Sequence, residues 1–230
     1  MTEIITIDGP AGSGKSTIAR LLAKRLGFLY LDTGAMYRAV ALAAKKNNIP
    51  FDREARLGDL CRTMDLRFNV TKDGTRLFLN GEDISLAIRS PEMDISSSTV
   101  SAVKEVRLAM TDLQRRLARS INVVAEGRDM GTVVFPDAKN KFFLTAEPYV
   151  RARRRYLERR ERGEHVTFEE VETLMKKRDK QDQSRRLAPL KPAQDAVIID
   201  SSELEPEEVL RLILNHVRRS YQMTDMPQKK

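Results

Sequence analysis

A glycine-rich segment that ends in a lysine and two hydroxyl residues carries the strongest chemical pattern in the chain. Residues 9–16 read Gly-Pro-Ala-Gly-Ser-Gly-Lys-Ser and match G-x-x-x-x-G-K-[ST]. Glycines let backbone N–H groups curl around phosphate oxygens, Lys15 can reach the outer phosphates, and Ser16 can ligate Mg²⁺. The predicted phosphate-binding residues are Gly9, Pro10, Ala11, Gly12, Ser13, Gly14, Lys15, Ser16 and Thr17.

A second candidate for chemistry is a short segment crowded with arginine, within residues 148–162. Three interpretations are open for it: a solvated helix face, a nucleic-acid surface, or a lid whose arginines close over a phosphate donor. Arg151 and Arg155 lie one turn apart and are the preferred pair for a lid, with Arg154 as the alternative. Its arginines are Arg151, Arg153, Arg154, Arg155, Arg159, Arg160 and Arg162.

The elements that must position these residues alternate between strand and helix. Apolar runs predict strands at 4–7, 28–31, 121–125, 141–144 and 197–199, and helical spacing predicts helices at 15–26, 35–47, 101–119, 148–162, 167–184 and 206–221. This order indicates an α/β fold with a central parallel sheet flanked by helices. In such sheets ligands bind at the carboxyl ends of the strands, which here follow Ile7, Leu31 and Ala125.

One stretch departs from this alternation. Residues 66–70 and 76–79 alternate apolar and polar side chains on either side of Lys72-Asp73-Gly74, which predicts an antiparallel hairpin. A chain of this length is too short for a large ATPase motor, whereas a small kinase needs only an acceptor site and mobile segments that exclude water. We therefore expect a single kinase-like domain over residues 1–221, with a core at 1–51, 106–148 and 191–221. Residues 52–105 would form an acceptor-binding insert, residues 149–190 a short helical lid, and residues 222–230 a polar tail.

Composition narrows the partners without naming one. The formal net charge of +8 indicates an anionic partner, and nucleic acid, a membrane surface or a phosphorylated small molecule all fit. No apolar run is long enough to span a membrane, and the first residues lack a signal-peptide pattern. The single cysteine, Cys61, favours a cytoplasmic location. The chain also lacks the Asn-Lys-x-Asp string of a GTPase.

Four strings in order resemble one known family, the bacterial cytidylate kinases. They are Ile-Asp-Gly-Pro-Ala-Gly-Ser-Gly-Lys-Ser at 7–16, Leu-Asp-Thr-Gly-Ala-Met-Tyr-Arg at 31–38, Gly-Arg-Asp-Met-Gly-Thr-Val-Val-Phe-Pro-Asp-Ala at 127–138, and the stretch from Arg178 to Leu190. The first is shared by many families, whereas the third is far more specific. The resemblance covers residues 4 to about 217, and the hairpin at 66–79 resembles the insert of these kinases.

The resemblance implies a role for each of ten further residues. Ser98, Arg107 and Asp129 look like the cytosine-reading set, because a carboxylate can accept from the N4 amine while a hydroxyl and a guanidinium serve the rest of the edge. Three arginines look like the clamp on the acceptor phosphate, since a guanidinium fork binds phosphate bidentately. The clamp is Arg38, Arg128 and Arg185; Arg178 and Asp182 look like ribose contacts, and Thr33 and Tyr37 shape the pocket.

The implied reaction is phosphoryl transfer from ATP, with Mg²⁺, to CMP and also to dCMP. Catalysis would rest on Lys15, Arg151 and Arg155, and Ser16 would be the protein's metal ligand. The alternative is a related small-molecule kinase with another acceptor, such as UMP. The resemblance favours the lid over a nucleic-acid surface for the arginine-rich segment. We expect a monomer that binds neither nucleic acid nor membrane.

Overall fold

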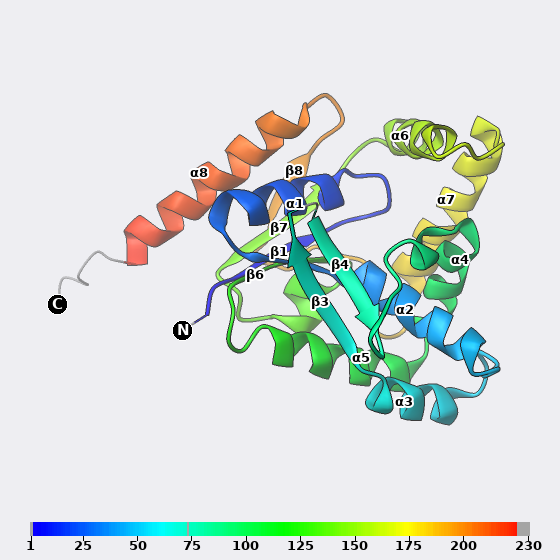
Figure 1. The fold of residues 1–230 in the computed structure, drawn as a ribbon. Helices are drawn as coiled ribbons and strands as arrows, with labels where there is room; N and C mark the ends of the chain where they lie inside the picture. Colours follow the sequence, from blue (N-terminus) through cyan, green and yellow to red (C-terminus); the bar gives the residue numbers. More distant parts are fainter. Residues whose placement is uncertain (1, 73, 225–230) are drawn as a thin grey trace. The chain divides into compact units, whose positions relative to one another are not determined.

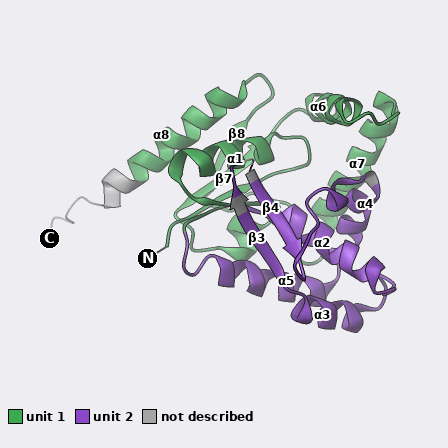
Figure 2. Ribbon diagram, viewed as in Figure 1, with its two compact units in different colours: residues 1–30, 122–230 green, residues 31–121 purple. Residues whose placement is uncertain are grey.

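The computed structural model describes residues 2–72 and 74–224, which form two compact units. Unit 1 comprises residues 1–30 and 122–230, and unit 2 comprises residues 31–121 (Figure 2). The predicted division into core, insert and lid stays a prediction. Among the described residues, no helix is both long enough and apolar enough to cross a membrane.

A parallel sheet in the order β2-β6-β1-β7-β8 forms the centre of the fold (Figure 1). Its strands are β1 (Ile4–Asp8), β2 (Leu29–Asp32), β6 (Val123–Gly127), β7 (Asn140–Thr145) and β8 (Val197–Asp200). The register aligns Ile7 with Glu126 and Asp8 with Gly127, so the phosphate loop and the segment after β6 begin at the same edge of the sheet. The central parallel sheet flanked by helices is confirmed.

The helices of unit 1 are α1 (Lys15–Leu26), α6 (Pro148–Glu161), α7 (Phe168–Ser184) and α8 (Pro206–Thr224), with a one-turn π-type helix η2 (Met130–Val134). Helix α1 packs against α8, and both cover a core that includes Ile5, Leu22, Phe142 and Ile213. Helix α8 continues beyond the predicted end at residue 221 and into the predicted tail. The rest of that tail, residues 225–230, lies outside the described residues.

Unit 2 carries the antiparallel sheet β3-β4-β5, made of β3 (Leu66–Thr71), β4 (Gly74–Leu79) and β5 (Glu82–Asp83). The predicted hairpin is confirmed, with Leu66 opposite Leu79; Asp73 itself is outside the described residues. The helices are α2 (Thr33–Lys46), α3 (Glu54–Thr63), η1 (Ala87–Arg89), α4 (Pro91–Val100) and α5 (Lys104–Leu117).

The sequence patterns missed α3 and α4, and they placed the start of α5 three residues too early. Helix α3 buries Leu57 and Cys61 one turn apart, which is a short apolar pattern. Helix α4 contains Ser96, Ser97 and Ser98, whose type has a weak helix propensity, and its packing against α2 overrides that preference. Ser101, the predicted first residue of the next helix, instead caps the end of α4.

Candidate functional site

The phosphate loop lies between β1 and α1. Two of its positions require glycine because the backbone of other segments lies too close to them for a side chain. A Cβ on Gly9 would meet the carbonyl oxygen of Leu144 at 2.0 Å, and a Cβ on Gly12 would meet the carbonyl oxygen of Arg151 at 2.7 Å. Gly12 also has φ +74°, a left-handed conformation that glycine adopts without strain. Any side chain at either position would displace backbone, so the loop tolerates only glycine there.

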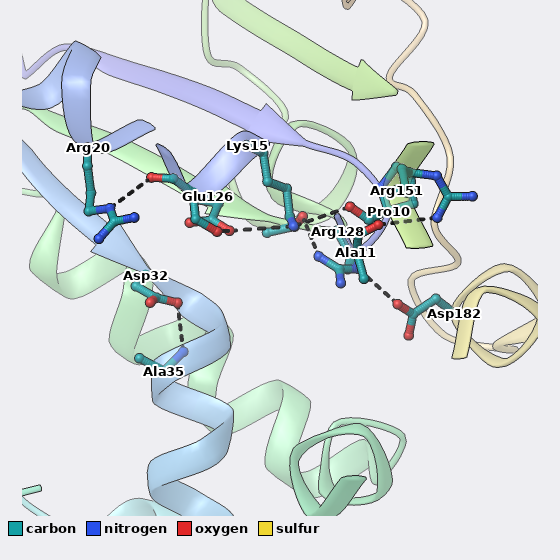
Figure 3. Close-up of polar contacts among 12 residues, drawn as sticks. Pro10, Ala11, Lys15, Arg20, Asp32, Ala35, Glu126, Arg128, Arg151 and Asp182 are labelled. Carbon is teal, nitrogen blue, oxygen red and sulfur yellow. Dashed lines mark hydrogen bonds and ion pairs between the residues drawn. The ribbon is translucent and has the colours of Figure 1, made fainter. Parts of the chain in front are cut away.

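Lys15 begins α1 and is 6% exposed. Its Nζ donates to the carbonyl oxygen of Pro10 at 3.3 Å and lies 3.6 Å from Oε1 of Glu126 (Figure 3). The Ser16 hydroxyl donates to the same Oε1 at 2.6 Å. The loop's lysine and hydroxyl therefore converge on one buried carboxylate from the neighbouring strand β6.

Glu126 is the functional candidate that sequence reasoning missed. Its Oε2 accepts a hydrogen bond of 2.5 Å from the Tyr30 hydroxyl. Burial raises the pKa of Glu126, but Lys15, Ser16 and Tyr30 outweigh it and hold that pKa below its usual value, so the group is an anion. The available signal was an acidic residue at the carboxyl end of a buried strand, just before Gly127-Arg128-Asp129.

A second buried network in unit 1 joins the segment after β6 to α7. Asp182 is 1% exposed and accepts from Nε of Arg128 at 2.8 Å and from Arg185. Burial opposes ionisation of Asp182, but Arg128, Arg185 and Arg178 hold its pKa below the usual value. The four predicted ribose and phosphate contacts of unit 1 thus lie together, as Figure 3 shows for Arg128 and Asp182. Asp129 follows Arg128 and is 2% exposed.

The predicted lid arginines lie on α6, and each has a different partner. Arg151 is buried; it donates to the carbonyl oxygen of Ala11 in the phosphate loop at 3.2 Å and to Asp179 of α7 at 2.6 Å. Arg154 donates to the carbonyl oxygen of Ser201 at 2.6 Å, whereas Arg155 donates to Glu158 on its own helix at 2.7 Å. Arg151 therefore contacts the phosphate loop directly.

Unit 2 brings together the other predicted acceptor contacts in two groups. Arg107 is 6% exposed, and its guanidinium lies 5.7 Å from the ring centroid of Tyr37 and donates to the carbonyl oxygen of Ser101 at 3.1 Å. Ser98, whose carbonyl oxygen accepts from the Ser101 hydroxyl at 2.9 Å, reaches the same turn. Ser98 and Arg107, two of the predicted cytosine-binding residues, therefore both contact Ser101 in the turn between α4 and α5.

The second group in unit 2 surrounds Arg38 on α2. Its guanidinium lies 3.4 Å from Asp94 and 3.6 Å from Asp32. Asp32 also caps α2, because it accepts from the Ala35 N–H at 2.7 Å (Figure 3). Thr33 is the first residue of α2 and is 2% exposed.

Comparison with known proteins identifies the family to which this sequence is similar. The family model "Cytidylate kinase" matches residues 5–219. A cytidylate kinase from Geobacter sp. (strain M21) is 51% identical over 94% of this chain and 92% of its own length. One from Caldanaerobacter subterraneus subsp. tengcongensis is 47% identical over 96% of both chains.

Among solved structures, an uncharacterised protein from Eubacterium ventriosum aligns with a TM-score of 0.54 at 14% identity, over 94% of this chain and 99% of its own. That likeness concerns the fold alone. The family match spans the phosphate loop, the segment after β6 and the arginine-rich helix α6. The chain belongs to the cytidylate kinase family.

Proposed function

We propose that this protein transfers the γ-phosphoryl group of ATP to CMP, and also to dCMP, giving ADP and the nucleoside diphosphate. The observation that carries the proposal is the match to cytidylate kinases, at 51% identity and over 94% of the chain in one case. The phosphate loop, whose Lys15 faces the buried carboxylate of Glu126, supports it. No observation favours UMP or another acceptor.

The donor phosphates are assigned to residues 9–17, with Lys15 at the outer phosphates. Arg151 already contacts this loop and is assigned to the charge that develops on the transferring group; Arg155 and Arg154 are the other candidates on α6. Phosphoryl transfer of this kind depends on positioning and charge stabilisation and forms no covalent intermediate with the enzyme. The acceptor phosphate is itself the nucleophile, so no dedicated general base is required.

Mg²⁺ is assigned to Ser16 together with Glu126. The fit rests on the Ser16 hydroxyl and the Glu126 carboxylate, which lie 2.6 Å apart beside the phosphate loop. Within residues 2–72 and 74–224 there is no group of three or more His, Cys, Asp or Glu side chains that could hold a metal ion. Mg²⁺ commonly uses one or two protein ligands plus substrate phosphates, which suits this pair. When bound, the ion neutralises charge on the phosphates.

The acceptor roles are assigned residue by residue within each unit. In unit 1, Asp129 is assigned to the cytosine N4 amine, Arg128 and Arg185 to the acceptor phosphate, and Arg178 and Asp182 to the ribose. In unit 2, Ser98 and Arg107 are assigned to the base, Arg38 to the phosphate, and Thr33 and Tyr37 to the pocket wall. That the protein is cytoplasmic and monomeric and binds no nucleic acid stays a prediction.

The test is ADP release from Mg-ATP with CMP, dCMP, UMP, AMP, GMP and shikimate as acceptors. We expect CMP and dCMP to have the highest kcat/KM. Asp129→Ala should lower kcat/KM for CMP roughly 100-fold, because the base would leave a polar edge unpaired. Asp137→Ala, an exposed carboxylate on the same segment, is the matched control and should have no such effect. Preference for another acceptor would refute the proposal.

A further inference from the structure

The carboxylate of Asp8 makes a contact that the proposed reaction does not use. Asp8 ends β1 and is 3% exposed. Its Oδ1 accepts from the backbone N–H of Met130 at 2.9 Å, and its Oδ2 accepts from the backbone N–H of Gly131 at 2.8 Å. One carboxylate therefore holds two consecutive amides of the segment that carries Arg128 and Asp129.

These amides begin the helix η2, whose N-cap residue is Asp129. Aspartate is among the side chains that most often cap a helix from the N-cap position, by accepting from the first free amides. Asp129 nevertheless makes no side-chain cap hydrogen bond. Asp8, from a different strand, accepts in its place.

The packing around η2 makes this arrangement specific. A Cβ on Gly131 would lie 3.0 Å from Oγ1 of Thr6 and 3.3 Å from Cδ of Lys141. The backbone of η2 thus packs against β1 and β7. Asp8 lies opposite Gly127 in the sheet, so its side chain spans the distance from β1 to the amides of Met130 and Gly131. The position of the segment is therefore fixed by backbone contacts, and the two amides that Asp8 holds directly follow Asp129.

We propose that Asp8 is a positioning residue for cytosine recognition: by holding the two amides that follow Asp129, it fixes the backbone from which the Asp129 carboxylate reaches the base. The inference rests on the proposed function, in which Asp129 accepts from the cytosine N4 amine. Without the Asp8 acceptors, the buried amides of Met130 and Gly131 would be unpaired, and the start of η2, with Asp129 before it, would shift. Discrimination between CMP and UMP would then fall.

The experiment measures the ratio of kcat/KM for CMP to kcat/KM for UMP in Asp8→Asn, together with the KM for ATP. Asparagine is nearly isosteric, but it replaces one acceptor oxygen with an NH₂ group that faces a backbone N–H. We expect the ratio to fall roughly tenfold or more while the KM for ATP changes little. Thr6→Val is the matched control, because the Thr6 hydroxyl is fully buried in the same strand without a hydrogen-bond partner among the described residues.

A cycle with Asp129→Asn separates positioning from general damage. If Asp8 acts through Asp129, then Asp8→Asn will not lower the ratio further in the Asp129→Asn background. An equal fall in both backgrounds, or a raised KM for ATP with an unchanged ratio, would overturn the proposal, the latter by assigning Asp8 to the phosphate loop.

Asp8→Ser is the second variant, for the case in which asparagine prevents folding. The shorter side chain leaves the two amides to water, which does not anchor the start of η2 to β1, and we expect the same loss of CMP selectivity. An unchanged ratio in Asp8→Ser would also overturn the proposal. If the unmodified enzyme prefers an acceptor other than CMP, the proposed function fails instead, and that result is read before any variant is made.

Discussion

At the scale of single residues, the site is organised around carboxylates that lie on neighbouring strands and accept from several donors. Glu126 accepts hydrogen bonds from the hydroxyls of Ser16 and Tyr30 and forms an ion pair with Lys15. Asp8 accepts hydrogen bonds from two backbone amides. The motif residues were predictable because their spacing in sequence is their signature. The roles of Glu126 and Asp8 were not, because they depend on which strands become neighbours in the sheet.

Tyr30→Phe tests the support of Glu126. The change removes the hydroxyl that donates to Oε2 and keeps the ring, so we expect the free energy of unfolding to fall by about 1–3 kcal/mol. We also expect kcat to fall while the KM for CMP is nearly unchanged, because the altered contact lies beside the phosphate loop. Urea unfolding and steady-state kinetics measure both effects.

The matched control for that change is Tyr149→Phe, since Tyr149 is 62% exposed on α6. It should alter neither stability nor kcat. If the two variants behave alike, the Tyr30 hydroxyl contributes nothing to the site.

At the scale of elements, the strand–helix alternation and the hairpin were predictable because apolar periodicity and turn residues are local signals. Helix α4 was not, since serine has a weak helix propensity and the packing of α4 against α2 depends on tertiary structure. The contact of α6 with the phosphate loop also could not be predicted from the sequence. Seven arginines look alike in the sequence, and only the fold selects Arg151 for the buried partner Asp179.

Asp179→Asn tests how strongly α7 holds α6. The pair is mostly buried, with the Arg151 and Asp179 side chains 9% and 15% exposed, and removing one charge leaves the other uncompensated. We expect the free energy of unfolding to fall by about 3 kcal/mol, as measured by urea denaturation.

Asp112→Asn provides the comparison, because Asp112 pairs with Arg116 on α5 in a pair that is more than half exposed on both sides. An exposed pair of this kind should cost about 0.5 kcal/mol or less. Equal losses in the two variants would show that burial of the Arg151–Asp179 pair has no energetic consequence.

At the scale of the whole molecule, Asp8 links folding stability to pH. Burial raises its pKa to about 7, against the two backbone hydrogen bonds that lower it; nearby Asp129 raises it and Arg128 lowers it. The folded protein therefore holds this proton more tightly than the unfolded chain does. Stability from this group is fully present below about pH 4 and is lost as pH rises through about 7.

Thermal unfolding of the unmodified protein and of Asp8→Asn between about pH 5 and pH 9 measures this link. We expect the stability of the unmodified protein, relative to the variant, to decline as pH rises and to level off above pH 8. The slope should not exceed about 1.4 kcal/mol per pH unit, the limit for one proton. A difference that is constant with pH would contradict the raised pKa.

Unit 2 is a single continuous segment, and the two residues of unit 1 near its ends lie next to each other. The Leu29 N–H donates to the carbonyl oxygen of Asn122 at 2.8 Å, so the chain departs after residue 30 and returns at residue 122 with its flanks already paired. Residues 31–121 are therefore a cassette between two neighbouring anchors. Because β2 ends at Asp32, recombination could exchange the rest of that cassette for another segment between the same anchors without rethreading the strands that hold the phosphate loop. The acceptor contacts proposed for unit 2 could then change while those proposed for unit 1 stay in place.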